Sequence, residues 1–309
     1  MTSPWRPGAA VVFAVAMLIA AGACHGAAGE PVAAPEKKPD APACDRATFR
    51  MVVDVGHTAE VPGAKTSRGL HEYEFNLRLA KLIDQQLRDA GFGKTILLIT
   101  DGGKMSSLAQ RVARANASGA DLFLSIHHDS VPDQFLEKWI YQGEEHSFSD
   151  RFKGHSIFIS NDNPDRAGSL AFARLLGRQM KARGLQYTHH YTEKFMGHRQ
   201  RILVDADAGV YRYDQLIVLK DTVMPAVLLE AGSIINRDEE LAMATPERQG
   251  LISASVLDAV DAFCAMRRPV HSAKGAHPVS TAARAKPSPA ATPAPAPAAA
   301  AWPFSWFKR

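Results

Sequence analysis

Short apolar segments alternate with longer amphipathic ones along the central part of the chain, and this alternation strongly constrains its fold. Residues 72–90 place Phe75, Leu79 and further apolar side chains on one helical face, and Gly91 ends the pattern. Helices are predicted over 72–90, 107–118, 169–183 and 239–267, and strands over 49–55, 95–100, 121–126, 156–160, 215–219 and 226–229. Such alternation favours an α/β fold with a mostly parallel sheet. No internal repeat is present, so we predict one domain over 47–268.

The first 24 residues have the layout of a secretory signal peptide. Arg6 supplies a positive charge, residues 9–20 form a nearly unbroken apolar run, and the small residues Ala21, Gly22 and Ala23 follow. The run is short for a membrane span, and an uncleaved N-terminal anchor is the alternative. Either arrangement places the folded part outside the cytoplasm.

The three cysteines bear on the same question. Cys24 follows the small residues directly, so it is a candidate for lipidation, although Ala21 stands where lipoprotein signals usually carry Leu. Lipidation and ordinary cleavage both remain open. Cys44 and Cys264 bracket the predicted domain, and a disulfide between them is a hypothesis for an oxidising compartment; two unrelated thiols are the alternative.

The segments that flank the predicted domain differ from it in composition. Residues 25–46 are rich in Ala, Pro, Lys and Asp and are predicted to be a flexible linker, and 269–309 to be a disordered Pro/Ala-rich tail. The aromatic and basic end of the tail is either a membrane or partner contact or incidental. The net charge of +4 comes without a basic stripe, which argues against nucleic acid binding. We expect a monomer.

Several residues with metal-binding or proton-transfer chemistry follow predicted strands. His57 comes just after residues 51–55, His127 follows the strand that ends at 126, and Glu230 follows the strand that ends at 229. Glu72 begins a helix that must start at the edge where the first strand stops. Since ligands of open α/β sheets bind beyond the carboxyl ends of the strands, these four side chains are expected to converge.

Two imidazoles and one carboxylate form the ligand set of many hydrolytic zinc sites, with a fourth position left for water. A further carboxylate is needed to move the proton of that water, and Glu230 is placed for this role. Spacing alone leaves open which of Glu72 and Glu230 has which task. Each residue taken singly is more often a turn histidine or a helix-dipole charge, so the interpretation depends on their joint placement.

These residues resemble the zinc-dependent N-acetylmuramoyl-L-alanine amidases of bacterial cell walls, over residues 50–262. The segments that carry the resemblance are Asp54-Val55-Gly56-His57, Gly63-Ala64, Gly69-Leu70, Glu72, Asn76-Leu77, Ser125-Ile126-His127 and Pro225-Ala226-Val227-Leu228-Leu229-Glu230-Ala231-Gly232. The resemblance implies Zn²⁺ on His57, Glu72 and His127, with Glu230 as catalytic acid/base. It also implies a six-stranded sheet, peptidoglycan as substrate, and cleavage between N-acetylmuramic acid and L-alanine.

Three positions depart from the pattern of that family. Val55 stands in place of Pro, His128 in place of a small residue, and Ser233 in place of Phe. We expect Val55 and Ser233 to alter packing rather than chemistry. His128 is expected to be a solvated turn residue, with a polar contact at the rim of the site as the alternative.

Two polar stretches between the predicted elements are expected to form walls of a substrate groove, with solvated loops as the alternative. Residues 131–155 contain Trp139, Tyr141, Glu144, Glu145 and His146, and residues 185–214 contain His189, His190, Tyr191, Glu193, His198, Arg199 and Arg201. Some similar amidases carry a helix in the later region that covers the zinc until an activator protein removes it. The stretch here is short and polar, which fits a groove wall better. A second metal on His189, His190 and His198 is not expected.

Two other functions compete with a peptidoglycan amidase in the cell envelope. One is a zinc peptidase or another hydrolase of extracytoplasmic amides, and the other is a non-catalytic wall-binding protein that retains the site. An intact Glu230 speaks against the second alternative. No phosphate-cradling glycine loop and no Ser-His-Asp or Cys-His arrangement supports a different mechanism.

Overall fold

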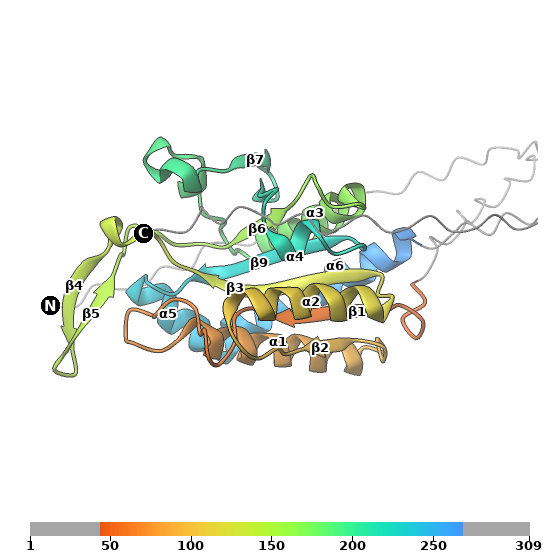
Figure 1. The fold of residues 1–309 in the computed structure, drawn as a ribbon, viewed down its shortest axis with the longest axis horizontal. Helices are drawn as coiled ribbons and strands as arrows, with labels where there is room; N and C mark the ends of the chain where they lie inside the picture. The colour runs from red at the N-terminus through yellow and green to blue at the C-terminus, as the bar shows by residue number, and fades with distance from the viewer. Residues whose placement is uncertain (1–43, 268–309) are drawn as a thin grey trace, which may run out of the picture. The chain divides into compact units, whose positions relative to one another are not determined.

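The structure is a computed structural model that describes residues 44–267 (Figure 1). The predicted signal peptide, Cys24, residues 25–43 and the tail lie outside the described residues. The predicted domain, 47–268, falls almost wholly inside this range, which begins three residues earlier, at Cys44.

A seven-stranded sheet forms the centre of the described part, in the order β2-β1-β3-β9-β6-β8-β7. Its strands are β1 Met51–Val55, β2 Ile96–Leu98, β3 Leu122–Asp129, β6 Ser156–Ile159, β7 Ile202–Asp205, β8 Val210–Arg212 and β9 Ala226–Ser233. β2, β1, β3 and β9 pair in parallel, whereas β6 is antiparallel to β9 and β7 is antiparallel to β8. The predicted mostly parallel α/β fold is confirmed, with seven strands where six were expected.

The helices and the remaining pieces follow the predicted alternation with some differences. The helices are α1 Glu72–Asp89, α2 Lys104–Ser118, α3 Arg166–Ala182, α4 Ile217–Lys220, α5 Arg237–Ala244 and α6 Pro246–Arg267. Short 3₁₀ turns are Asp133–Phe135, His190–Thr192 and Lys194–Arg199, and a separate hairpin joins β4 Glu137–Tyr141 to β5 Glu144–Phe148. In Figure 1 this hairpin projects beyond one end of the sheet.

Two of the predicted elements differ in the structure. The strand expected over 215–219 is wrong, because Ile217–Lys220 is a helical turn that buries both Val218 and Leu219. Packing against the sheet overrides the strand preference of these β-branched and aliphatic residues. The helix expected over 239–267 is two helices, because the chain breaks at Thr245 and Pro246 opens α6 at the position where proline suits a helix.

Helices cover both faces of the sheet and bury two apolar layers. On one face, α1, α3 and α6 pack on alternate residues of the strands. The buried cluster formed there includes Val53 and Leu124 of the strands and Ile83, Phe172 and Val260 of the helices. On the other face α2 and α4 meet the remaining strand residues, which include Val52, Phe123 and Leu228. The parallel strands are thus buried on both sides, and this burial fixes their register and holds their carboxyl ends in place.

α6 is long and apolar enough to span a membrane by length and composition alone. In the fold it packs against α1 and α3, and Val256, Val260 and Phe263 are buried in the core cluster. We therefore interpret α6 as a core helix.

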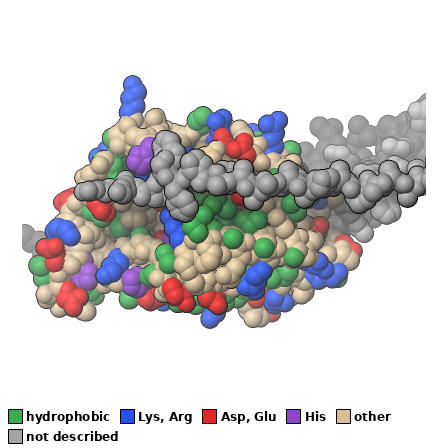
Figure 2. Space-filling view, viewed as in Figure 1, with side chains coloured by type: hydrophobic (Ala, Val, Ile, Leu, Met, Phe, Trp, Pro, Cys, Tyr) green, Lys and Arg blue, Asp and Glu red, His purple; other side chains and the backbone are tan. Residues whose placement is uncertain are grey.

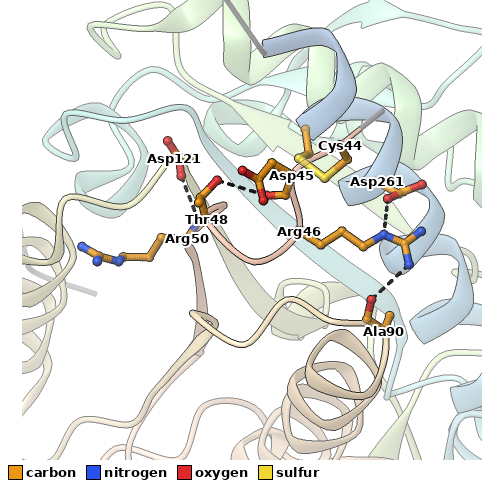
Figure 3. Close-up of a disulfide and its surroundings, with 9 residues drawn as sticks. Cys44, Asp45, Arg46, Thr48, Arg50, Ala90, Asp121 and Asp261 are labelled. Atoms are coloured by element: carbon orange, nitrogen blue, oxygen red, sulfur yellow. Dashed lines mark hydrogen bonds and ion pairs between the residues drawn. A yellow bond between two sulfur atoms is a disulfide. The ribbon is translucent and has the colours of Figure 1, made fainter. Parts of the chain in front are cut away.

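Cys44 and Cys264 form a disulfide, with their Cα atoms 5.1 Å apart (Figure 3). The hypothesis from the sequence is therefore confirmed in the structure. The bond ties the start of the described chain to α6, and Arg46 adds hydrogen bonds to Asp261 and to the Ala90 carbonyl, at 2.7 and 3.0 Å. These contacts close a loop that contains nearly the whole domain.

Candidate active site

Three neighbouring strands deliver three of the predicted site residues to one edge of the sheet. β1 ends at Val55, and His57 follows it after one glycine. His127 on β3 and Glu230 on β9 are direct partners in the parallel register. Both strands continue past these residues, to Asp129 and Ser233, so His127 and Glu230 lie within strand ends rather than after them.

Glu72, the first residue of α1, completes the group of metal-binding residues. Its Oε2 lies 3.0 Å from His57 Nε2, and its Oε1 lies 3.0 Å from His127 Nδ1. Among residues 44–267, His57, Glu72 and His127 form the one group of three such side chains whose ligand atoms all lie within 4.8 Å of one another. The convergence expected from the sequence is therefore present.

Close backbone approaches shape this group. A Cβ atom at Gly56 would overlap the His127 ring, and one at Gly63 would overlap the Glu72 carboxylate. His57 itself has a φ of 67°, in the left-handed region that residues with a Cβ rarely occupy. Backbone strain of this kind is held in place by surrounding contacts and clusters at functional sites.

The donor set suits zinc. Burial alone would raise the pKa of the Glu72 carboxyl, but hydrogen bonds with His127 and His57 outweigh it and lower that pKa well below its usual range. A buried carboxylate that stays charged between two imidazoles matches a His₂Glu zinc site with a position left for water.

A second layer of contacts holds Glu72. The Asn76 amide donates to Glu72 Oε1 at 3.2 Å and to the Gly56 carbonyl at 3.1 Å. His128 Nδ1 lies 2.7 Å from Asn76 Oδ1. The expectation that His128 is a solvated turn residue is wrong: it is buried, because β3 continues beyond His127, and burial lowers its pKa to about 3.

Another buried network lies under His57, and sequence reasoning missed it. Arg111 on α2 donates from Nη2 to the carbonyls of Val55 and His57, and its Nε lies 3.1 Å from Asp54 Oδ1. Ser125 Oγ donates to the other oxygen of Asp54 at 2.7 Å. Arg111 therefore fixes the backbone that presents His57. An aspartate inside the apolar strand 51–55 was the sequence signal for this network.

Glu230 faces the same cleft as the three metal-binding residues. Its Oε2 is buried and has no hydrogen-bond partner among the described residues. Burial and the nearby charges of Asp129 and Glu72 raise the pKa of Glu230 well above its usual range, while Arg199 opposes the shift. A carboxyl with a raised pKa is suited to take up a proton and to release it again during a reaction.

Asp129, two residues after His127, connects the site to the segment 185–214. Tyr191 donates its hydroxyl to Asp129 Oδ1 at 2.8 Å, and Arg199 Nη2 lies 3.9 Å from the same oxygen. Arg199 also donates to the Ser130 carbonyl at 3.0 Å. The segment is thereby fixed against the catalytic edge of the sheet.

Two clefts meet at the site. The smaller, about 510 Å³, contains His57, Glu72, His127 and Glu230 in its wall. The larger, about 1210 Å³, shares His57, His127 and Glu230 with it and extends along residues 198–202 and 212–216. The expectation that 185–214 forms a groove wall is confirmed, and within the described residues this segment carries only short turns and strands.

Residues 131–155 divide between the groove and the hairpin. Val131, Pro132 and Asp133 line the smaller cleft. In the hairpin, Trp139 donates to the Ser67 carbonyl at 2.8 Å and stacks on Tyr141. The hairpin thus supports the loop that leads to Glu72.

The other polar residues of the two stretches do not build a second metal site in the part of the chain described. His190 is buried, with Nδ1 2.6 Å from Thr188 Oγ1, and His198 lines the larger cleft. On the face shown in Figure 2, acidic and basic side chains are interspersed over the described surface.

Comparison with known proteins identifies the family. The family model of N-acetylmuramoyl-L-alanine amidases (Amidase_3) matches residues 51–262. An uncharacterised protein of Bacillus subtilis (strain 168), YqiI, is 26% identical over 214 residues, which cover 69% of this chain and 84% of that protein. A putative N-acetylmuramoyl-L-alanine amidase of Buchnera aphidicola subsp. Baizongia pistaciae is 23% identical over 67% of this chain and 92% of its own length.

The fold agrees with this match. The crystal structure of an N-acetylmuramoyl-L-alanine amidase from Clostridium difficile 630 superposes with a TM-score of 0.55 at 19% identity, over 72% of this chain and all of that one. The family model covers well over half of the chain, and its range contains all four residues that meet at the cleft. The chain therefore belongs to the N-acetylmuramoyl-L-alanine amidase family.

Proposed function

We propose that this amidase uses one zinc ion, held by His57, Glu72 and His127, and Glu230 as its acid/base, to release stem peptides from peptidoglycan in the cell envelope. One observation carries the proposal: the three ligand residues converge within 4.8 Å in the wall of a cleft that Glu230 also lines. Zinc in this set would polarise the scissile carbonyl and lower the pKa of a bound water.

Glu230 has the tasks that remain. We assign it to accept the proton of the attacking water and to pass it to the nitrogen of L-alanine as the amide bond breaks. Its raised pKa supports this assignment, because the carboxyl can hold that proton between the two steps. Glu72, whose pKa is lowered between two imidazoles, is suited to remain a charged ligand. The geometry thus favours the division of roles that spacing left open.

The cellular location is inferred from the substrate and from the composition of residues 1–24. Family members act on the cell wall, so the protein works outside the cytoplasm. We propose export by residues 1–24 to the periplasm, and the disulfide between Cys44 and Cys264 is consistent with an oxidising compartment. We also propose a lipid anchor at Cys24. The intact mass of the protein extracted from membranes shows whether this cysteine carries a lipid.

The direct test of the roles is the Glu230→Gln variant, which keeps shape and removes the proton carrier. We expect it to bind one zinc per chain, as the wild type does, and to lose about 10²- to 10⁴-fold in turnover of muramyl peptides. Mass spectrometry of the products identifies the bond that the wild type cleaves. Full activity of the variant, or wild-type products other than stem peptides that begin with L-alanine, would contradict the proposal and favour another zinc hydrolase.

A further inference from the structure

The two clefts that meet at the site differ in charge. Among the described residues, the smaller cleft is lined by four acidic side chains and one guanidinium. The acids are Glu72, Asp129, Asp133 and Glu230, and the guanidinium is that of Arg199. The larger cleft is lined by the cations Lys104, Arg111, Arg199, Arg201 and Arg212 and by the acids Glu60, Asp214 and Glu230. The larger cleft is thus the side suited to an anionic part of the substrate.

Most guanidinium groups of the larger cleft already have anionic partners. Arg111 faces Asp54 at 3.1 Å, and Arg212 faces Asp214 at 2.8 Å. Arg199 is held by the Ser130 carbonyl and lies near Asp129.

Arg201 differs from these arginines. It forms no ion pair with any acidic side chain in residues 44–267, and its Nε is buried with no hydrogen-bond acceptor there. Its guanidinium lies 3.8 Å from the centre of the Tyr213 ring, and Nη1 donates to the carbonyls of His198 and Gln200, each at 2.9 Å. The Arg201 guanidinium is therefore held in place, while some of its N–H groups have no acceptor among the described residues.

We propose that Arg201 binds a carboxylate on the peptide side of the scissile amide, so that the enzyme prefers stem peptides whose second residue has a free α-carboxylate over those in which it is amidated. This inference rests on the proposed function: Arg201 and Glu230 line one cleft, and we assign that cleft to the peptide that leaves the scissile bond. Each extended residue advances the chain by about 3.3–3.6 Å, so the first residues after L-alanine lie nearest the site.

The chemistry of the two halves of the substrate supports this direction. The sugar ring beside the scissile bond carries hydroxyl and acetamido groups without charge, whereas the peptide carries carboxylates. A guanidinium pairs with a carboxylate through charge-assisted hydrogen bonds, and a fixed guanidinium loses little side-chain freedom on binding. A carboxamide has one oxygen acceptor and no charge, so it cannot replace that partner.

The test uses two synthetic muramyl tripeptides that differ only at the second residue, which carries an α-carboxylate in one and an α-carboxamide in the other. We expect wild-type kcat/KM to be about 10- to 100-fold higher for the carboxylate, as for a hydrogen-bonded ion pair. Arg201→Gln should remove this preference, mainly by raising KM for the carboxylate tripeptide. Arg201→Lys should restore part of the preference.

Arg178→Gln is the matched control, because it removes one positive charge from an exposed position on α3, where Arg178 faces Asp207 at 3.6 Å. It should keep the wild-type preference. Equal wild-type rates on the two tripeptides, or an unchanged ratio in Arg201→Gln, would overturn the inference and leave the amidase assignment intact. Cleavage of neither tripeptide at the muramyl bond would instead contradict the proposed function. A urea unfolding curve like that of the wild type shows that Arg201→Gln is folded.

Discussion

The catalytic edge of the sheet and the segment 185–214 face the same clefts but are held in different ways. At the edge, strand register places His127 opposite Glu230, and buried polar partners such as Asn76 hold the ligands. In the segment, short turns and a two-strand ribbon present Arg199 and Arg201 through carbonyl contacts and ring stacking.

We infer from this difference that the edge of the sheet carries out the chemistry and that the segment determines substrate selectivity. Residues that must keep a fixed geometry for a metal are built on central strands and the start of a long helix. Residues of the segment contact the edge through few side chains, of which Tyr191 and Arg199 reach Asp129. Substitutions in the segment should therefore change which substrate is cleaved, and substitutions at the edge should change whether any substrate is cleaved.

The largest difference between the two regions is expected when one histidine of each is replaced by alanine. His127→Ala removes one of three zinc ligands, so we expect the zinc content to fall from one per chain towards zero and activity to become undetectable. His198→Ala, in the wall of the larger cleft, should retain zinc and turnover. Elemental analysis and a muramyl-peptide assay on both variants measure this. Zinc loss in His198→Ala, or its retention in His127→Ala, would reverse the comparison.

A smaller effect is expected from Arg111→Met, which leaves the ligands in place and removes the group that holds the His57 backbone. Zinc affinity should fall about 10- to 100-fold, as for other residues that orient ligands. The free energy of unfolding should also fall by about 3–5 kcal/mol, because Asp54 loses its buried partner. Competition with a zinc chelator and urea unfolding measure the two quantities.

Arg114→Met on the same helix is the control for Arg111, because its side chain lies at the surface. It should leave zinc affinity unchanged and alter stability by less than about 0.5 kcal/mol. If the two variants bind zinc equally well, the network under His57 has no part in the site.

The smallest effect on the chemistry should come from the disulfide, which is part of neither region. Replacing Cys44 and Cys264 together by alanine should lower the free energy of unfolding by about 2–4 kcal/mol, since a long loop is no longer closed. Turnover at 25 °C should stay near the wild-type value, because neither cysteine lines the clefts described. Unfolding curves and kcat/KM of the double variant test this. A large loss of turnover in a folded variant would show that the bond holds the site.

The edge of the sheet was predictable from the sequence, whereas the segment was not. β1, β3 and β9 are mainly apolar, and each is followed or ended by a residue with catalytic chemistry, so a local pattern locates the site. Glu72 was found because a long amphipathic helix begins there.

The remaining elements depend on partners that are distant in sequence. β7 and β8 are short; they pair with each other, and β8 also pairs with β6. α4 is a helical turn because both Val218 and Leu219 are buried there. The roles of Arg111 and His128 depend on contacts with Asp54 and Asn76, 57 and 52 residues away. No local periodicity contains such information.

The measurement that tests the central claim most directly is digestion of purified peptidoglycan by the zinc-loaded protein, with and without a chelator, followed by mass analysis. The account predicts intact stem peptides with N-terminal L-alanine and glycan strands that keep their lactyl groups, and loss of both products with the chelator. Zinc added back after the chelator should restore them. Stem peptides released equally well by the fully zinc-depleted protein, or peptides cut within the stem, would contradict it.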